Sequence, residues 1–227
     1  MRPLSAFPLV RRWLAWRARP GPLRDYYDRN IGSLSAPYDQ AELLAIDLET
    51  TGLDPDTDEI LSIGYVPISG GRVRLGGAAH HLVRPLGQVP EETAVIHGLL
   101  DGALATAPPL DEVLPRLLDA LAGRVAIAHH ARIEREFLGA ACRRLYGRPL
   151  TMPFICTLAL ERRAHTLEGG DAGNGDLRLG SIRSRYGLPR YRTHNALADA
   201  LAAAELFLAQ AAHSSGTKPA RLRSLLI

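Results

Sequence analysis

The chain has 227 residues, of which 46% are hydrophobic and 22% are charged. This length fits one ordinary domain, and this composition supplies enough apolar side chains for a sizeable core. No apolar run approaches the ~18 residues that cross a bilayer, which argues against a membrane-spanning helix. The two cysteines, Cys142 and Cys156, make neither a CxxC pair nor a disulfide framework. We therefore expect core thiols and a cytoplasmic protein.

Positive charge is concentrated at the N-terminus. Residues 1–30 hold seven arginines against Asp25 and Asp28, which gives this segment a net charge of +5. Because the whole chain carries +3, residues 31–227 carry a net charge of −2. The body is therefore not a basic protein, although the pI of the whole chain is about 9.1, and the distribution of charge is more informative than its total.

Residues 1–40 are interpreted as a basic, Pro- and Arg-rich N-terminal arm. The segment Leu9–Arg19 has helical spacing, with Leu9, Trp13 and Trp16 on one face. Two interpretations stay open. The arm is either a partly ordered tail, or it docks on the body, on a partner or on an acidic surface.

The main domain is expected over residues 41–212, followed by a short C-terminal tail over residues 213–227. Apolar and β-rich runs predict strands over Leu43–Leu48, Glu59–Ile68, Arg72–Val83 and Arg124–Ala128, and a strand that runs into a helix over Phe154–Leu160. Helical spacing predicts helices over Leu110–Leu121, Ile133–Tyr146, Ser181–Tyr186 and Asn195–Ala212. Early strands followed by alternating helix and strand predict an α/β domain with a mixed sheet.

The first candidate site is formed by Asp47 and Glu49, at the end of the first expected strand. Side chains at positions i and i+2 of a strand point to the same face, whereas Leu48 points to the other. Two carboxylates at the end of an apolar strand are costly unless a cation neutralises them, and oxygen ligands of this kind suit Mg²⁺ or Mn²⁺. Taken alone the pattern is weak, because a solvated surface pair has the same sequence.

The second candidate site is formed by His194 and Asp199, at the start of the last long expected helix. A histidine just before a helix and an aspartate near its start can present both groups on one side. Asp199 lies among alanines and leucines, where a carboxylate either caps something or binds a metal. A lone His194 is usually a hydrogen-bonded surface residue, but in combination with Asp199 and the strand-end pair it indicates catalysis.

The third candidate site follows the strand expected at residues 124–128. The next helix presents Glu134 on the side opposite its core-facing residues. The pair His129-His130 does not indicate zinc, because neighbours on a strand point to opposite faces and no cysteine lies nearby in the sequence. The alternative for Glu134 and Glu136 is a solvated helix face with arginines around it.

In this order and spacing, the three segments resemble the three motifs of the DEDDh exonucleases, the DnaQ-like group that contains the epsilon subunit of bacterial DNA polymerase III. The likeness covers roughly Ala41 to Ala212, and it is specific because several short signatures recur at the family's spacing. The further matching stretches are Asp54–Gly64, His97-Gly98-Leu99, Ala107-Pro108-Pro109, Ile155-Cys156-Thr157 and Tyr186-Gly187-Leu188.

The resemblance implies an RNase H-like fold, in which helices flank a five-stranded mixed β-sheet. It also implies two divalent ions, Mg²⁺ or Mn²⁺, held by four carboxylates. Asp47 would bridge both ions, Glu49 and Asp199 would hold the ion that activates water, and Glu134 would support the other. His194 would be the general base.

The resemblance also implies contacts with the substrate. The backbone around Thr50, Thr51 and Gly52 would border the terminal nucleotide, and Leu53 would wedge against its base. His97 and His129 are further candidate substrate contacts, although a packing role for His97 is an equal alternative. In addition, the Arg-rich stretch 178–192, including Arg183 and Arg185, is a candidate phosphate track.

One position departs from the family pattern. The family usually has Asp where this chain has Glu134, and a His-Asn pair where this chain has His129-His130. Mg²⁺ demands ligand distances of about 2.0–2.1 Å, so the extra methylene requires that the helix sits further back or that the second ion is held less directly. Glu136 is a weaker candidate, because a two-residue shift turns a side chain about 200° around a helix.

The expected function is that of a 3′→5′ exonuclease that hydrolyses phosphodiester bonds at the 3′ end of DNA, single-stranded or frayed, and releases nucleoside 5′-monophosphates. An exoribonuclease related to oligoribonuclease or RNase T is the first alternative, because the metal chemistry is common to both. An inactive nucleic-acid-binding or scaffold module is the second. The nucleic acid 3′ end is the expected partner and a membrane is not, whereas a polymerase partner and the oligomeric state stay open.

Overall fold

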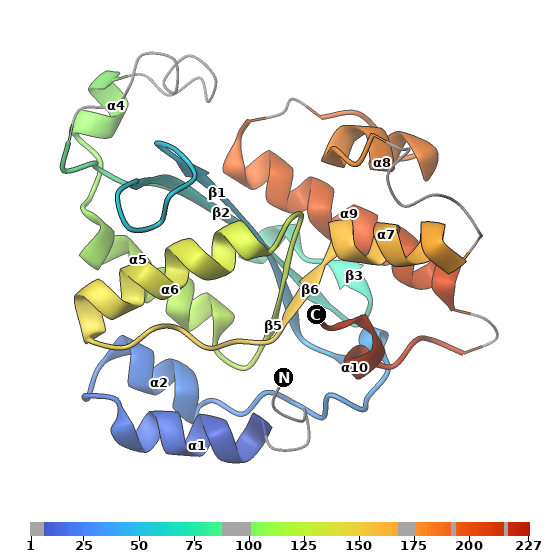
Figure 1. Cartoon of the computed structure of the whole chain (residues 1–227), viewed down its shortest axis with the longest axis horizontal. Helices are drawn as coiled ribbons and strands as arrows, with labels where there is room; N and C mark the ends of the chain where they lie inside the picture. The colour runs from blue at the N-terminus through green and yellow to red at the C-terminus, as the bar shows by residue number, and fades with distance from the viewer. Residues whose placement is uncertain (1–6, 88–100, 168–175, 192–193, 216–217) are drawn as a thin grey trace.

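The computed structural model covers the whole chain and describes residues 7–87, 101–167, 176–191, 194–215 and 218–227. Its centre is a single β-sheet with helices on both faces (Figure 1). The strands are β1 (Leu43–Thr50), β2 (Ile60–Ser69), β3 (Arg72–Val73), β4 (Ala79–Leu82), β5 (Val125–Ala128) and β6 (Phe154–Cys156).

The sheet is mixed, as predicted. Its order is β3-β2-β1-β5-β6, with β4 also paired to β2. The pair β1/β2 is antiparallel, whereas β1/β5 and β5/β6 are parallel. The strand predicted at residues 72–83 is interrupted by a 3-10 turn at Leu75–Gly77, so β3 and β4 pair with β2 one after the other. Six strands thus occupy the five positions of an RNase H-like sheet.

The helices agree with the predicted positions where the sequence was periodic. Asn195 begins the longest described helix, since its side chain accepts a hydrogen bond from Ala198 N at 3.0 Å. None of the helices within the described ranges is long and apolar enough to cross a membrane. The helices are α1 (Phe7–Arg17), α2 (Pro22–Asp28), α4 (Asp101–Ala105), α5 (Leu110–Leu121), α6 (Arg132–Tyr146), α7 (Thr157–Leu167), α8 (Leu179–Arg185), α9 (Ala196–Ser214) and α10 (Leu222–Leu225), with a 3-10 turn at Tyr38–Gln40.

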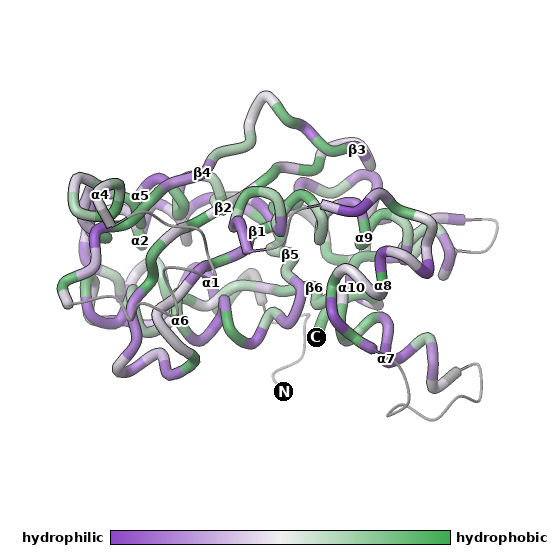
Figure 2. Tube along the Cα trace, turned by 90° about the horizontal axis from the view of Figure 1, so that it is seen from above, coloured by the Kyte–Doolittle hydropathy of each residue, from purple (hydrophilic) through white to green (hydrophobic). Residues whose placement is uncertain are grey.

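The alternation of side chains along β1 divides the core into two parts. Leu44, Ile46 and Leu48 pack in a cluster that includes buried residues of α5 and α6. Leu43 and Ala45 pack on the opposite face, in a cluster with residues of α9 and α10. Figure 2 shows hydrophobic residues along β2 and β5, and helices around them in which hydrophobic and hydrophilic residues alternate. Odd-numbered side chains of β1 therefore face α9.

The N-terminal helices pack on the body. Tyr26 and Tyr27 of α2 are buried in the cluster beneath α5 and α6, and the Tyr27 hydroxyl accepts a hydrogen bond from Thr151 N at 2.9 Å. The buried guanidinium of Arg11 lies 4.4 Å from the ring centroid of Tyr26 and donates to the carbonyl oxygens of Tyr26 and Arg29. Docking on the body was one of the predicted alternatives for this segment.

The C-terminal residues also join the core. Leu222 and Leu225 of α10 are buried in the cluster on the α9 side. Isolated bridges connect Pro37 to Arg221 and Ile155 to Leu226, so the C-terminal segment contacts both the chain before β1 and the strand β6. The division of the chain into residues 1–40, 41–212 and 213–227 stays a prediction.

Gly64 allows α9 to approach the sheet. In the register of the antiparallel pair, Gly64 of β2 lies opposite Asp47 of β1. A Cβ atom at Gly64 would lie 2.1 Å from the carbonyl carbon of Ala196, the first residue of α9. Only hydrogen fits between these two backbones. This close approach sets the position of the start of α9 relative to β1.

We expect Gly64→Ala to lower the free energy of unfolding by about 1–3 kcal/mol, because the methyl group must push α9 away from β2. Urea denaturation measures this loss. Gly139→Ala in α6 is the matched control, since nothing crowds the added methyl group, and it should raise stability by roughly 0.5–1 kcal/mol. If the Gly64 and Gly139 variants were equally stable, the close approach of α9 to β2 at Gly64 would be contradicted.

Candidate active site

Three carboxylates meet between β1 and the start of α9. Asp47, Glu49 and Asp199 each offer an oxygen atom, and these oxygens all lie within 4.8 Å of one another. Asp47 and Glu49 are odd-numbered residues of β1, so they face α9, whose first turn contains Asp199. This donor set consists of oxygen atoms only, and it fits a hard divalent cation such as Mg²⁺ or Mn²⁺.

Burial and mutual repulsion oppose ionisation of these carboxylates. Burial, followed by the charges of Glu134, Glu49 and Asp199, raises the pKa of Asp47 well above its usual value. Burial and the charge of Asp199 raise the pKa of Glu49 to about 8. Burial also raises the pKa of Asp199, although hydrogen bonds from the backbone of His194 and Asn195 oppose that shift. A bound cation would remove the penalty that all of them share.

Glu134 lies in the first turn of α6 and points into the protein. Its side chain is buried, and its Oε2 atom has no hydrogen-bond partner among the described residues. Burial raises the pKa of Glu134 to about 8. Glu134 is not one of the three carboxylates whose oxygens lie within 4.8 Å, but its charge acts on Asp47. Glu136 is directed elsewhere, since it pairs with Arg132 at 2.8 Å.

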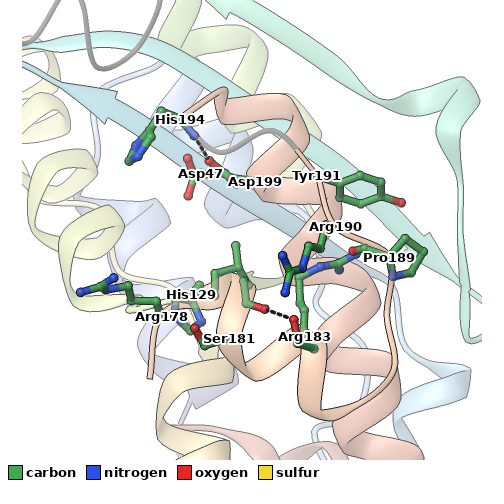
Figure 3. Close-up of a pocket in the computed structure, with 13 residues that line it drawn as sticks. Asp47, His129, Arg178, Ser181, Arg183, Pro189, Arg190, Tyr191, His194 and Asp199 are labelled. Atoms are coloured by element: carbon green, nitrogen blue, oxygen red, sulfur yellow. Dashed lines mark hydrogen bonds between the residues drawn. The ribbon is translucent and has the colours of Figure 1, made fainter. Parts of the chain in front are cut away.

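His194 precedes α9 in a left-handed backbone conformation, with φ of 65°. A non-glycine residue adopts this conformation at an energetic cost, and such residues are often found at functional sites. Its backbone N–H donates to Asp199 Oδ2 at 2.8 Å. Figure 3 shows His194, Asp47 and Asp199 together at one end of a pocket. The side chain of His194 is exposed to solvent.

His129 lies in the pocket wall with both ring nitrogens engaged. Its Nε2 is 3.0 Å from the Leu177 carbonyl oxygen, and its Nδ1 is 2.8 Å from Thr157 Oγ1. A carbonyl can only accept, so Nε2 carries the proton and the Thr157 hydroxyl donates to Nδ1. Burial lowers the pKa of His129 to about 4. These bonds connect the end of β5 to the segment before α8.

The loop after β1 leaves Leu53 in the solvent. Thr51 Oγ1 donates to Asp58 Oδ1 at 2.9 Å, and the Thr50 hydroxyl donates to the Gly52 carbonyl at 2.6 Å. The exposed fraction of Leu53 is 79%, so its side chain is available to a ligand. The other candidate substrate contact, His97, lies outside the described residues.

The pocket beside the carboxylates has a volume of about 730 Å³. Asp47, Asp199 and His194 line one end, and the rest is lined by His129, by residues of α8 and by the segment before His194 (Figure 3). The sequence did not single out Ser181 or Tyr191, which also line it. A Ser or Tyr without a recognisable motif carries no signal until the fold brings it to the pocket.

The prediction of a phosphate track is wrong for Arg183, and it stays a prediction for Arg185, which is exposed. Arg183 is buried, and it pairs with Glu205 at 2.8 Å and donates to the Ala202 carbonyl. Arg185 pairs with the buried Glu161 at 3.0 Å. Both guanidinium groups therefore hold α8 against neighbouring helices. Within the same stretch, Arg178 and Arg190 also line the pocket beside Arg183.

Comparison with known proteins agrees with this geometry. A family model described as an exonuclease, of the RNase T type, matches residues 44–207. The chain belongs to this exonuclease family. The matched range contains all four acidic positions and His194, and the match agrees with the predicted membership of the DnaQ-like DEDDh exonucleases.

Several curated relatives are named as DNA polymerase III proteins. The chain is 33% identical over 180 residues to a DNA polymerase III PolC-type of Thermotoga maritima, a match that covers 79% of this chain and 12% of that protein. It is 27% identical to the DNA polymerase III subunit epsilon of Aquifex aeolicus, over 73% of this chain and 78% of that one. The chain thus spans only about an eighth of the PolC-type protein.

Solved structures share the fold. Exonuclease X in complex with 5′ overhanging duplex DNA has a TM-score of 0.62 and 23% identity, and the match covers 81% of this chain and 98% of that one. The nuclease domain of 3′hExo, a DEDDh family member bound to rAMP, has a TM-score of 0.65 and 17% identity, covering 79% and 96%. These likenesses confirm the predicted RNase H-like architecture.

We expect the thermal midpoint of the metal-free protein to fall as the pH rises from about 5 to about 8, the pKa of Glu49. The folded protein keeps protons that the unfolded chain releases in this window, so unfolding is favoured as the pH rises. Mg²⁺ or Mn²⁺ should raise the midpoint more at the upper end, because it binds the deprotonated carboxylates. Differential scanning fluorimetry with chelator or metal measures both effects.

Glu49→Gln is the informative variant for this experiment. It removes one carboxyl group of raised pKa, so the decline in the midpoint with pH should become shallower in chelator. Glu136→Gln, which changes an ion-paired surface residue, should leave the decline as it is. A stabilisation by metal that does not vary with pH would contradict the assignment of these carboxylates as its ligands.

Proposed function

We propose that this exonuclease degrades nucleic acid from the 3′ end and releases nucleoside 5′-monophosphates, with DNA as its substrate. One observation carries the proposal: carboxylates from β1 and α9 converge on one point, with Glu134 of α6 acting on the same point. In such a cluster the carboxylates either keep protons at neutral pH or are neutralised by a bound cation, and the cation allows all of them to ionise. The family membership agrees with this chemistry.

Asp47, Glu49, Asp199 and Glu134 are proposed to hold two ions, Mg²⁺ or Mn²⁺. When bound, a pair of divalent cations supplies the charge that activates water and stabilises the leaving oxygen. The unsatisfied Oε2 of the buried Glu134 supports its inclusion. The Glu134 side chain is one methylene longer than the aspartate usual in the family. Because it extends from α6 rather than from β1, this extra length agrees with a ligand that reaches the ions from further away.

His194 is proposed as the general base that takes the proton of the attacking water. Its backbone bond to Asp199 Oδ2 supports this role, because it keeps the histidine beside the carboxylates. The side chain is exposed at the mouth of the pocket, so a proton taken there can pass on to solvent. His129 is proposed to border the terminal nucleotide through its ring face, since both of its nitrogens are engaged by the protein.

The terminal nucleotide is proposed to contact the loop of Thr50, Thr51, Gly52 and Leu53. The exposed Leu53 supports a contact with the terminal base, and Asp58 stiffens the loop behind it. DNA is favoured because the relatives are named as DNA polymerase III proteins and Exonuclease X was solved with DNA. A related fold bound to rAMP keeps RNA as the alternative. We place this activity in the cytoplasm, in residues 41–212.

We expect Glu134→Gln to lower kcat by at least about tenfold, because it removes a charge that we assign to the metal site. Glu136→Gln, two residues along the same helix, should keep the activity of the parent protein. Hydrolysis of a labelled oligonucleotide under Mn²⁺ compares the two variants. If the Glu136 variant loses activity and the Glu134 variant keeps it, the assignment on α6 is reversed.

The direct test of the proposed function uses oligonucleotides labelled at the 5′ end, in matched DNA and RNA sequences, with Mn²⁺, Mg²⁺ or chelator. We expect a ladder of products that shorten by one nucleotide, which appears only with metal and is stronger on DNA. Asp47→Asn should abolish the ladder, whereas Asp111→Asn, on the exposed start of α5, should not. A labelled mononucleotide released at once from the 5′ end would overturn the polarity.

A further inference from the structure

A second basic surface lies at the far end of α6. A cavity of about 520 Å³ opens there between the turn that joins α1 to α2 and the C-terminal end of α6. Arg17 and Arg19 line it from the first side, and Arg144 and Arg148 line it from the second. Its remaining lining residues carry no charge: they are Pro20, Gly21, Leu23, Leu145, Tyr146 and Gly147.

The positive charge of this cavity is not neutralised within the described parts of the chain. There, none of the four arginines forms an ion pair with a carboxylate, whereas Arg183 and Arg185 each pair with a glutamate. Arg148 Nε instead donates to the Arg17 carbonyl oxygen at 3.1 Å, which ties the two sides of the cavity together. Guanidinium groups that share one concavity repel one another, and an anion bound between them removes that repulsion.

Two exposed tryptophans lie on α1, and one of them contacts an arginine of the cavity. The exposed fractions of Trp13 and Trp16 on α1 are 49% and 74%, and the Arg17 guanidinium lies 5.1 Å from the ring centroid of Trp13. The face predicted from the sequence, with Leu9 beside them, is therefore turned to solvent rather than to the body. Exposed aromatic rings next to arginines are the combination on which single-stranded nucleic acids stack and neutralise their phosphates.

The cavity is connected to the candidate active site by one rigid element. Figure 1 shows α6 running from the middle of the molecule to the edge where α1 turns into α2. Glu134 lies in its first turn and Arg144 in its last, so ten residues at a rise of about 1.5 Å separate them by roughly 15 Å along the axis. A strand of a few nucleotides is long enough to span this distance.

We infer that the surface formed by Trp13, Trp16, Arg17, Arg19, Arg144 and Arg148 is a second nucleic-acid-binding site. Its arginines take phosphodiester groups, in the bidentate manner that guanidinium allows, and its indoles take bases. The concave shape favours a strand over a flat anionic membrane, since the arginines of a hollow cannot all reach a bilayer. The inference uses the family's action on nucleic acids and is independent of the polarity of digestion.

Intrinsic fluorescence tests this inference directly. The chain has two tryptophans in all, and both belong to this surface, so their emission reports on it alone. An oligodeoxythymidine of about 16 nucleotides, long enough for one binding platform, is titrated into the full chain in chelator. We expect its binding to quench the emission, with an affinity that falls steeply as salt is added.

The variant is Arg19→Glu with Arg144→Glu, since neither side chain makes a hydrogen bond or ion pair with another described residue. This double variant should lower the affinity for the oligonucleotide, measured by quenching, about tenfold. It should also reduce the slope of the logarithm of the association constant against the logarithm of the salt concentration by about 1.4, which corresponds to two lost phosphate contacts. Arg72→Glu with Arg74→Glu, on exposed positions at β3, changes the net charge equally and should bind as the parent does. The unfolding midpoints of both variants verify folding.

Three outcomes overturn the inference. The first is the absence of quenching in the parent, the second is an equal loss in the two charge-reversal variants, and the third is an emission shift with phosphatidylglycerol vesicles but not with the oligonucleotide. The last outcome would assign the surface to a membrane instead. The labelled-strand assay keeps the proposals separate: a normal ladder without quenching removes only the second site, and quenching without a ladder removes only the proposed 3′→5′ activity.

Discussion

The repulsion among buried carboxylates is the constraint on which the active site depends. Asp47 and Glu49 are two residues apart on one strand, and Asp199 is brought against them by a helix that begins about 150 positions later in the chain. Without a cation, each charge raises the free energy of the others, and burial adds to that penalty. The surrounding structure must therefore hold these groups together against their own electrostatics.

The rest of the fold supplies that rigidity. β1 is paired along its length with β2 and at its start with β5, so its carboxylates cannot separate by bending the strand. Gly64 lets α9 lie directly on β2, and the Asn195 cap fixes where the helix begins. Behind the pocket, Arg183 anchors α8 to α9.

The two basic regions of the protein have different structural roles. The arginines Arg183 and Arg185 of α8 form internal ion pairs, although they belong to the Arg-rich stretch that precedes His194 in the sequence. Arginines at the end of α1 and the end of α6 are far apart in sequence, yet they share one cavity without a neutralising carboxylate among the described residues. Charge density along the chain is therefore a poor guide to where an anion binds. Convergence in space is the better guide.

The sequence by itself determined the mixed α/β fold and the family, and it predicted the acidic residues, because strand period, helix period and motif spacing are local properties of the chain. Only the tertiary structure decided what depends on distant partners. Asp58 stiffens the loop after β1, and Thr157 orients His129, although both lie in stretches that the resemblance had marked. Arg183 became structural because Glu205 lies opposite it, and no local pattern contains that pairing.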